Sequence, residues 1–251
     1  MTGFGADFAG AEVRVSPNFG PRGEGAGLEL LILHYTGMET GEAAEAWLCD
    51  PASGVSSHYL VHEDGRVVQM VRESDRAWHA GAGSWKGEGD VNSRSIGIEI
   101  VNGGHAYGLP DFPDVQIMAV IGLCRDICQR RAIRPEGVLA HSDIAPGRKV
   151  DPGEMFPWER LAEAGVGLIA APKPCEGAEP CREGAEGPAV ERLQSMLALH
   201  GYGVEIDGRF DARTRIVVEA FQRHFRRSRV DGVADAETLG LLGGLLAATA
   251  G

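Results

Sequence analysis

The segment PKPCEGAEPCREGAEG, residues 172–187, is the feature that most limits how this chain can fold. It consists mostly of Pro, Gly, Glu and Cys and has no apolar periodicity, which is typical of a linker. The 251 residues therefore predict one large and one small domain, since domains usually contain about 100 to 200 residues. We place the large domain at 1–171, the linker at 172–186 and the small domain at 187–251.

Short apolar runs alternate with helical patterns in the large domain. Strands are predicted at 28–34, 58–62, 67–71 and 95–101, and helices at 40–48 and 115–131. The Asp-Gly pair at 64–65 predicts a hairpin between the second and third strands. Interleaved strands and helices indicate an α/β domain in which helices flank a mixed central β-sheet.

An internal repeat organises the small domain. The sequence DGRFDART at 207–214 recurs as DGVADAET at 231–238. Each copy places an Asp-Gly turn before an Asp that can cap the helix that follows. With a further helix predicted at 188–200, the repeat indicates a compact three-helix domain.

The charge balance limits the partners of the chain. Its formal net charge of −12 argues against nucleic acid and anionic lipid, because binding to both depends on Lys and Arg. No apolar run is long enough to span a membrane. Residues 1–27 lack the basic start and apolar run of a signal peptide, so we expect a cytoplasmic protein, with periplasmic export by another route as the alternative. We also expect a monomer.

The five cysteines show no metal-binding spacing. Cys124 and Cys128 are four positions apart in a predicted helix, so we expect both to be small buried apolar residues. Cys49 has no partner in the pattern. Whether Cys175 and Cys181 form a disulfide is left open, because the bond needs an oxidising compartment.

Three side chains have the chemistry of a hydrolytic metal site. His34 ends the first strand, His141 follows another short apolar run, and Asp151 lies ten residues later. Two imidazoles and one carboxylate leave a fourth position for water, which is the pattern of catalytic zinc. Zinc lowers the pKa of its water to about 7. A structural, hydrogen-bonded histidine at the strand end is the alternative.

Two further residues suit proton transfer and charge stabilisation. Ile96, Ile98 and Ile100 share one face of their strand, so Glu99 on the other face is expected to open toward a cleft and act as acid and base. Lys149 can stabilise a developing oxyanion. The pattern alone also permits a merely solvated glutamate.

Five segments in order carry a family resemblance: LILHYTG, VSSHYLV, RAWHAG, NSRSIGIEIVNGG and HSDIAPGRKVDPGEMFPW. Over residues 28–165 the chain resembles the zinc-dependent N-acetylmuramoyl-L-alanine amidases of the type-2 amidase family, and among them the bacterial anhydro-amidases. The resemblance implies that His34, His141 and Asp151 bind Zn²⁺, that Glu99 is the catalytic acid/base and that Lys149 stabilises the transition state.

The resemblance also implies a set of substrate-binding residues. Tyr35 adjoins a ligand, and the segment at 78–81 belongs to the loop that lines the family's cleft, where an aromatic ring suits a sugar or peptide. A structural role is the alternative for His58, and core packing for Trp78. The full set is Tyr35, His58, Trp78, His79, Asn92 and Arg94. His105, His200 and His224 have no such context, and we expect them to be solvent or packing residues.

The small domain resembles the three-helix peptidoglycan-binding domain often appended to cell-wall hydrolases. The resemblance rests on VERLQSMLALHGY, the two Asp-Gly motifs and Phe221-Gln222. A binding module raises the local concentration of an enzyme on a polymer. We expect a tethered module, so that deleting residues 173–251 spares the hydrolysis of small soluble muropeptides.

Together the two resemblances imply a hydrolase of peptidoglycan or muropeptides. The bond cut is the amide between N-acetylmuramic acid, or its 1,6-anhydro form, and L-alanine of the stem peptide, in cell-wall recycling or remodelling. The alternatives are a non-catalytic peptidoglycan-binding protein of the same fold and a zinc endopeptidase that cuts within the stem peptide.

Overall fold

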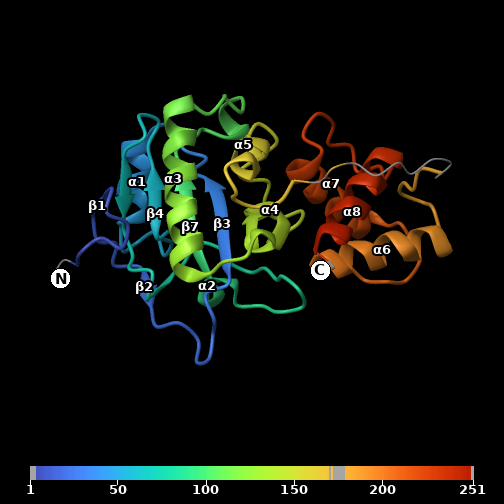
Figure 1. Ribbon diagram of the computed structural model, residues 1–251, viewed down its shortest axis with the longest axis horizontal. Coiled ribbons are helices and arrows are strands. Elements are labelled where there is room, and N and C mark those ends of the chain that lie inside the picture. The colour runs from blue at the N-terminus through green and yellow to red at the C-terminus, as the bar shows by residue number, and fades with distance from the viewer. Residues whose placement is uncertain (1–3, 170, 172–178, 250–251) are drawn as a thin grey trace.

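The large domain is built around one six-stranded sheet. The computed structural model describes residues 4–169, 171 and 179–249 (Figure 1). The strands of the sheet are β1 (Ala11–Val13), β3 (Leu30–Tyr35), β4 (Tyr59–Val61), β5 (Val67–Gln69), β7 (Ser95–Ile100) and β8 (Val138–Ala140). Their order is β1-β5-β4-β7-β3-β8. Only the β4–β5 hairpin is antiparallel, so the sheet is mixed, as the sequence predicts.

Helices and short turns surround this sheet. The helices are α1 (Gly41–Leu48), α2 (Val91–Arg94), α3 (Asp114–Arg131), α4 (His141–Ile144) and α5 (Trp158–Glu163). Two 3-10 turns span His105–Tyr107 and Pro135–Gly137. A separate ribbon pairs β2 (Phe19–Gly20) with β6 (Arg76–Ala77). No helix in the described part of the chain is long and apolar enough to cross a membrane.

The two faces of β3 and β7 differ: one packs in the hydrophobic core and the other carries polar side chains. Side chains alternate along a strand, and Leu31 and Leu33 pack with the three isoleucines of β7 against α3, which crosses the sheet in Figure 1. Cys124 of α3 is buried in this cluster, as expected, whereas Cys128 is only partly buried and packs against it. The opposite face carries His34 on β3 and Glu99 on β7, which are direct neighbours in the parallel register.

Three helices form the C-terminal domain: α6 (Pro188–His200), α7 (Ala212–Phe225) and α8 (Ala236–Thr249). Asp211 caps α7 by accepting two backbone N–H bonds, as the repeat predicts. Gln194 Oε1 accepts hydrogen bonds from the backbone N–H groups of Asp207 and Gly208, and Gln222 holds the second Asp-Gly turn in the same way. The fold class predicted from the sequence is thus confirmed in both parts.

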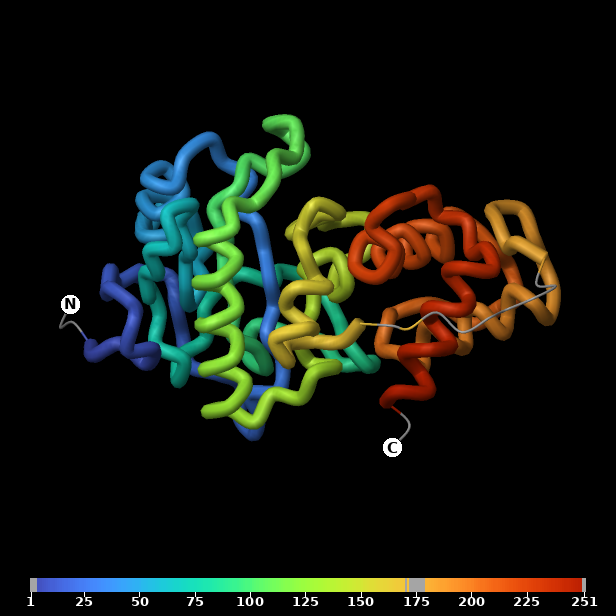
Figure 2. The backbone as a smooth tube through the Cα atoms, turned by 45° about the horizontal axis from the view of Figure 1, so that its top comes forward, coloured from blue at the N-terminus to red at the C-terminus, as the bar shows by residue number. Residues whose placement is uncertain are grey.

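The C-terminal helices pack directly against the large domain (Figures 1 and 2). α7 contacts α4, and buried residues of both domains belong to one hydrophobic cluster. Cys175 lies outside the described residues, so the question of a disulfide with Cys181 stays open, and the exact domain boundaries stay a prediction.

Candidate active site

A cavity of about 400 Å³ opens where β3, β7 and β8 end. The carboxyl ends of parallel strands are where ligands bind in α/β sheets. Residues from several loops, from α1 and from β7 line it, among them Met38, Trp47, Trp78, Glu99, Lys149 and Asp151.

Three buried donor atoms meet at the floor of this cavity. His34 Nδ1 lies 2.8 Å from His141 Nδ1 and 3.1 Å from Asp151 Oδ2, and the last two atoms are 2.9 Å apart. Each residue is at most 5% exposed. Among the described residues this is the one group of three side chains whose geometry suits a metal ion.

The hydrogen bonds of His141 fix its tautomer. Its Nε2 lies 3.0 Å from the carbonyl oxygen of Ala80. A carbonyl can only accept, so Nε2 carries the proton and Nδ1 directs its lone pair at the cluster.

A chain of hydrogen bonds fixes His34 in the same way. Ser95 Oγ donates to the Val91 carbonyl at 2.6 Å, so it accepts from His79 Nε2 at 3.2 Å. His79 Nδ1 is therefore an acceptor, and His34 Nε2 donates to it at 3.0 Å. The Nδ1 lone pair of His34 is left facing the cluster.

The cluster thus brings three lone pairs to one point with no proton between them. Burial and the neighbouring His141 lower the pKa of His34 to about 4, which keeps this imidazole neutral. Two neutral imidazoles and a carboxylate are mutually repulsive here unless a cation binds them, so the donor set fits a zinc ion.

Glu99 faces the same cavity from the neighbouring strand. Its Oε2 is buried and has no hydrogen-bond partner within the described ranges. Burial raises the pKa of Glu99 well above its ordinary value; the Asp151 carboxylate adds to this rise, and the Lys149 ammonium opposes it. A carboxylate oxygen that is buried without a partner costs stability, so its place here suits a chemical role.

Comparison with known proteins agrees with this geometry. Residues 24–154 match the N-acetylmuramoyl-L-alanine amidase family, and residues 186–242 match the family of peptidoglycan binding domains. The chain is 38% identical over 232 residues to the N-acetylmuramoyl-L-alanine amidase AmiD of Escherichia coli (strain K12), a match that covers 87% of this chain and 82% of the relative. The chain belongs to the N-acetylmuramoyl-L-alanine amidase family.

Solved structures extend the similarity over both domains of the amidase. The complex of E. coli AmiD with anhydro-N-acetylmuramic acid-L-Ala-D-γ-Glu-L-Lys superposes with a TM-score of 0.78 at 37% identity, covering 91% of this chain and 93% of that one. AmpDh3 of Pseudomonas aeruginosa in complex with anhydromuramic pentapeptide gives a TM-score of 0.70 at 31% identity, covering 96% of both chains.

Lys149 lies on the loop that joins two donors of the amidase's cluster. It lines the cavity, and its backbone N–H bonds to Ala145 at 3.1 Å. The backbone N–H of Ser142 bonds to the Asp151 carbonyl at 3.0 Å, which closes the loop on itself. The neighbouring Arg148, which sequence reasoning missed, also lines the cavity and donates to the Ala80 carbonyl at 2.6 Å.

Three of the expected substrate-binding residues reach the cavity. Tyr35, Trp78 and His79 all line it, and His79 also supports His34 as described above. The sequence analysis did not single out Trp47, which lines the same cavity and is 49% exposed. The sequence does not distinguish Trp47 from any other residue of the helix predicted at 40–48, so its place beside the cavity could not be predicted.

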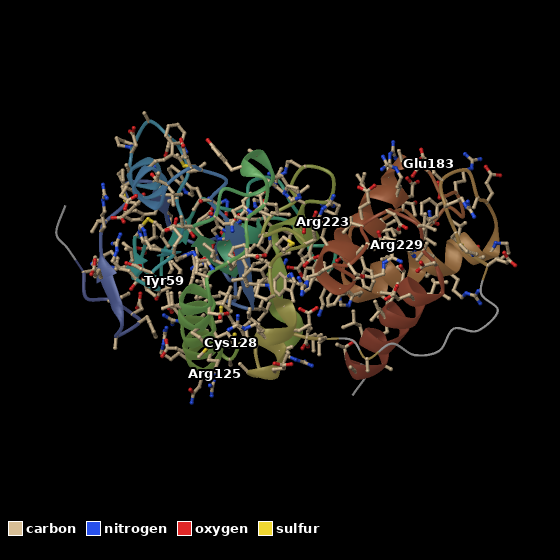
Figure 3. The ribbon with its side chains drawn as sticks, turned by 90° about the horizontal axis from the view of Figure 1, so that it is seen from above. Tyr59, Arg125, Cys128, Glu183, Arg223 and Arg229 are labelled. Atoms are coloured by element: carbon tan, nitrogen blue, oxygen red, sulfur yellow. The ribbon has the colours of Figure 1, made fainter. Side chains whose placement is uncertain are left out.

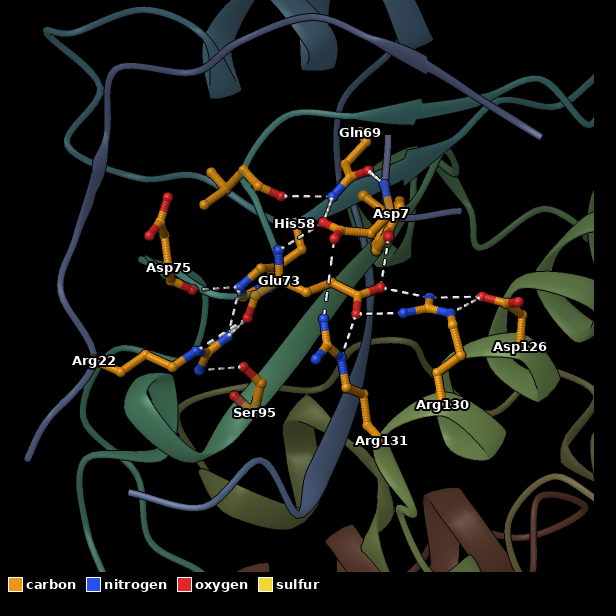
Figure 4. Close-up of polar contacts among 12 residues, drawn as sticks. Asp7, Arg22, His58, Gln69, Glu73, Asp75, Ser95, Asp126, Arg130 and Arg131 are labelled. Carbon is orange, nitrogen blue, oxygen red and sulfur yellow. Dashed lines mark hydrogen bonds and ion pairs between the residues drawn. The ribbon is translucent and has the colours of Figure 1, made fainter. Parts of the chain in front are cut away.

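The structure does not bring His58 to the cavity. This side chain is completely buried: its Nδ1 accepts from the Gly97 N–H at 3.0 Å, and its Nε2 lies 3.0 Å from both the Asp75 carbonyl and Arg22 Nη2 (Figure 4). Burial, with the Arg22 charge, lowers the pKa of His58 to about 3. In the structure His58 therefore links the segments that contain Arg22 and Asp75 to strand β7 of the sheet.

Asn92 and Arg94 also lie outside the cavity lining. Asn92 Oδ1 accepts from the backbone N–H groups of His79 and Ala80, so it shapes the loop next to the donor cluster. Arg94 is 9% exposed and pairs with Glu29 on another surface. The contacts of both residues are therefore with the protein's own backbone and side chains, and not with the cavity where substrate would bind.

Gly97 makes the support of His34 possible. A Cβ at this position would lie 2.5 Å from the His79 ring. We predict that Gly97→Ala displaces His79 and weakens zinc binding about tenfold, a typical effect of losing a partner behind a ligand. Gly122→Ala is the control, because Gly122 in α3 has open space around it. Chelator competition measures the affinity, and an unchanged value for Gly97→Ala would refute the supporting role.

Proposed function

We propose that this amidase hydrolyses the bond between N-acetylmuramic acid and L-alanine with a zinc ion held by His34, His141 and Asp151. The observation that carries the proposal is the convergence of three unprotonated donor atoms beside the unpartnered carboxyl of Glu99. When bound, zinc polarises the scissile carbonyl and lowers the pKa of its water to about 7.

Glu99 moves the proton in this proposal. Its carboxyl faces the donor cluster, so it accepts the proton of the attacking water and delivers it to the leaving amine of L-alanine. Lys149, on the same cavity wall, offers its ammonium to the oxyanion that develops at the carbonyl. The apolar and aromatic side chains of Tyr35, Trp47 and Trp78 supply a surface for sugar and peptide.

A binding protein without activity is the competing reading. It would have no use for an unpartnered glutamate beside a complete ligand set, because such a carboxyl costs stability and adds no recognition of neutral sugar. The endopeptidase reading differs only in the bond cut, which mass spectrometry of the products distinguishes.

We further propose 1,6-anhydro-N-acetylmuramyl peptides as the substrate. The support is that AmiD and AmpDh3, similar over both domains, were crystallised with anhydromuramyl peptides. The compartment and the monomeric state expected from the sequence stay predictions.

The first prediction from this proposal concerns Glu99→Gln. This variant keeps the shape of the side chain but cannot take a proton, so we expect kcat to fall about 10²- to 10⁴-fold while zinc remains bound. Glu42→Gln on the exposed surface of α1 is the control and is expected to keep full activity. Loss of zinc from the Glu99 variant, measured by metal analysis, would make Glu99 a ligand and the assignment wrong.

The second prediction concerns the form of the substrate. Soluble anhydromuropeptide is expected to give a higher initial rate than intact sacculi at equal stem-peptide concentration, because the similar amidases AmiD and AmpDh3 were crystallised with anhydromuramyl peptides. Released peptides are quantified by liquid chromatography. A faster rate on sacculi would reverse the substrate proposal and favour wall remodelling.

A further inference from the structure

The ligand His141 begins a helix that is too short to be stable alone. α4 contains four residues, His141–Ile144, whereas isolated helices need roughly three times that length or more. The direction of the His141 side chain therefore depends on the contacts that hold α4 in place.

Asp143 closes the first turn of this helix. The residue is 1% exposed, and its Oδ2 accepts a hydrogen bond from the backbone N–H of Ala140 at 2.8 Å. This is the carboxylate half of a capping box, and it fixes the backbone directly before His141.

The other partners of the Asp143 carboxylate come from the C-terminal domain. Tyr202 donates its hydroxyl proton to Oδ1 at 2.6 Å, and His224 Nδ1 bonds to Oδ2 at 2.7 Å. Both residues are buried. A buried carboxylate is tolerated only when it is hydrogen-bonded, so the orientation of Asp143 depends on these two donors.

Aromatic contacts from both domains fix the two donors. The His224 ring stacks on Trp158 with centroids 3.8 Å apart, and Trp158 begins α5 of the large domain. Tyr202 meets Trp85 of the large domain edge to face at 5.1 Å. Neither donor is therefore free to leave the carboxylate while the domains stay in contact.

The apolar core is shared across the same boundary. Ile144 of α4 lies in one hydrophobic cluster with Leu197 and Phe221 of the C-terminal domain. Gly201 packs so closely on the buried Trp85 that a Cβ at this position would lie 2.6 Å from the indole ring. The backbone N–H of Lys86 also bonds to the Gly201 carbonyl at 2.8 Å.

We infer that the C-terminal domain is a structural part of the metal site, and that Tyr202 and His224 are positioning residues that orient the ligand His141 through Asp143. The inference rests on the proposed zinc function. It also replaces the tethered module expected from the sequence. Removing residues 173–251 would expose Trp85 and Ile144 and leave Asp143 without two of its three partners, so hydrolysis of small muropeptides would fall as well.

The test compares two Tyr→Phe variants in the full-length protein. Tyr202→Phe removes a buried hydroxyl that bonds a buried carboxylate at 2.6 Å, and Tyr59→Phe removes the same bond, at the same length, to Glu73. Tyr59 lies in the large domain far from the C-terminal helices (Figure 3). We expect both variants to lower Tm similarly, whereas only Tyr202→Phe weakens zinc binding about tenfold and lowers kcat with KM unchanged.

A second pair of variants tests the other donor. His224→Asn can keep a donor near the position of Nδ1 and is expected to retain most of the zinc affinity. His224→Leu has no donor and is expected to weaken zinc binding as much as Tyr202→Phe does. Zinc affinities come from competition with a chromophoric chelator, independently of hydrolysis. Wild-type affinity in both Tyr202→Phe and His224→Leu would overturn the inference. Tight zinc binding by the wild type without amide hydrolysis would instead refute the proposed function.

Discussion

Parallel pairing between β3 and β7 sets His34 beside Glu99, and the rest of the site depends on this register. A slip of one residue would turn Glu99 into the core and bring an isoleucine to the donor cluster. The register is secured by the opposite face, where Leu31, Leu33 and the isoleucines of β7 pack against α3. Burial of these apolar side chains thus holds a carboxyl and an imidazole side by side at the mouth of the sheet.

The donor cluster shows how neutral groups prepare a cation site. Each histidine donates a hydrogen bond from Nε2–H to a fixed acceptor, which is the Ala80 carbonyl for His141 and the His79 ring for His34. Both Nδ1 lone pairs therefore point inward. The same logic continues outward to Asp143, whose partners belong to the C-terminal domain. Catalysis and the stability of the domain contact are therefore coupled, since both use α4.

The sequence predicts those features of the fold and the site that follow from a local, periodic pattern of apolar residues. The isoleucine alternation at 96–100 predicts that Glu99 faces the cavity, and apolar spacing predicts α3. His58 shows the limit: a histidine in a strand beside the site looks like a substrate contact, but its partners Arg22 and Asp75 lie far away in sequence. His224 was expected only to face solvent or to pack, because its bond to Asp143 crosses the linker and leaves no periodic signal.

We propose that a zinc ion held by His34, His141 and Asp151 is needed to cut the amide between N-acetylmuramic acid and L-alanine. The most direct measurement is mass spectrometry of the products from anhydromuropeptide, with metal-free protein and after addition of one equivalent of zinc. We expect no product without metal, and with zinc an intact peptide that begins with L-alanine together with the free anhydro sugar. Undiminished cleavage by metal-free protein, or cleavage within the stem peptide, would contradict it.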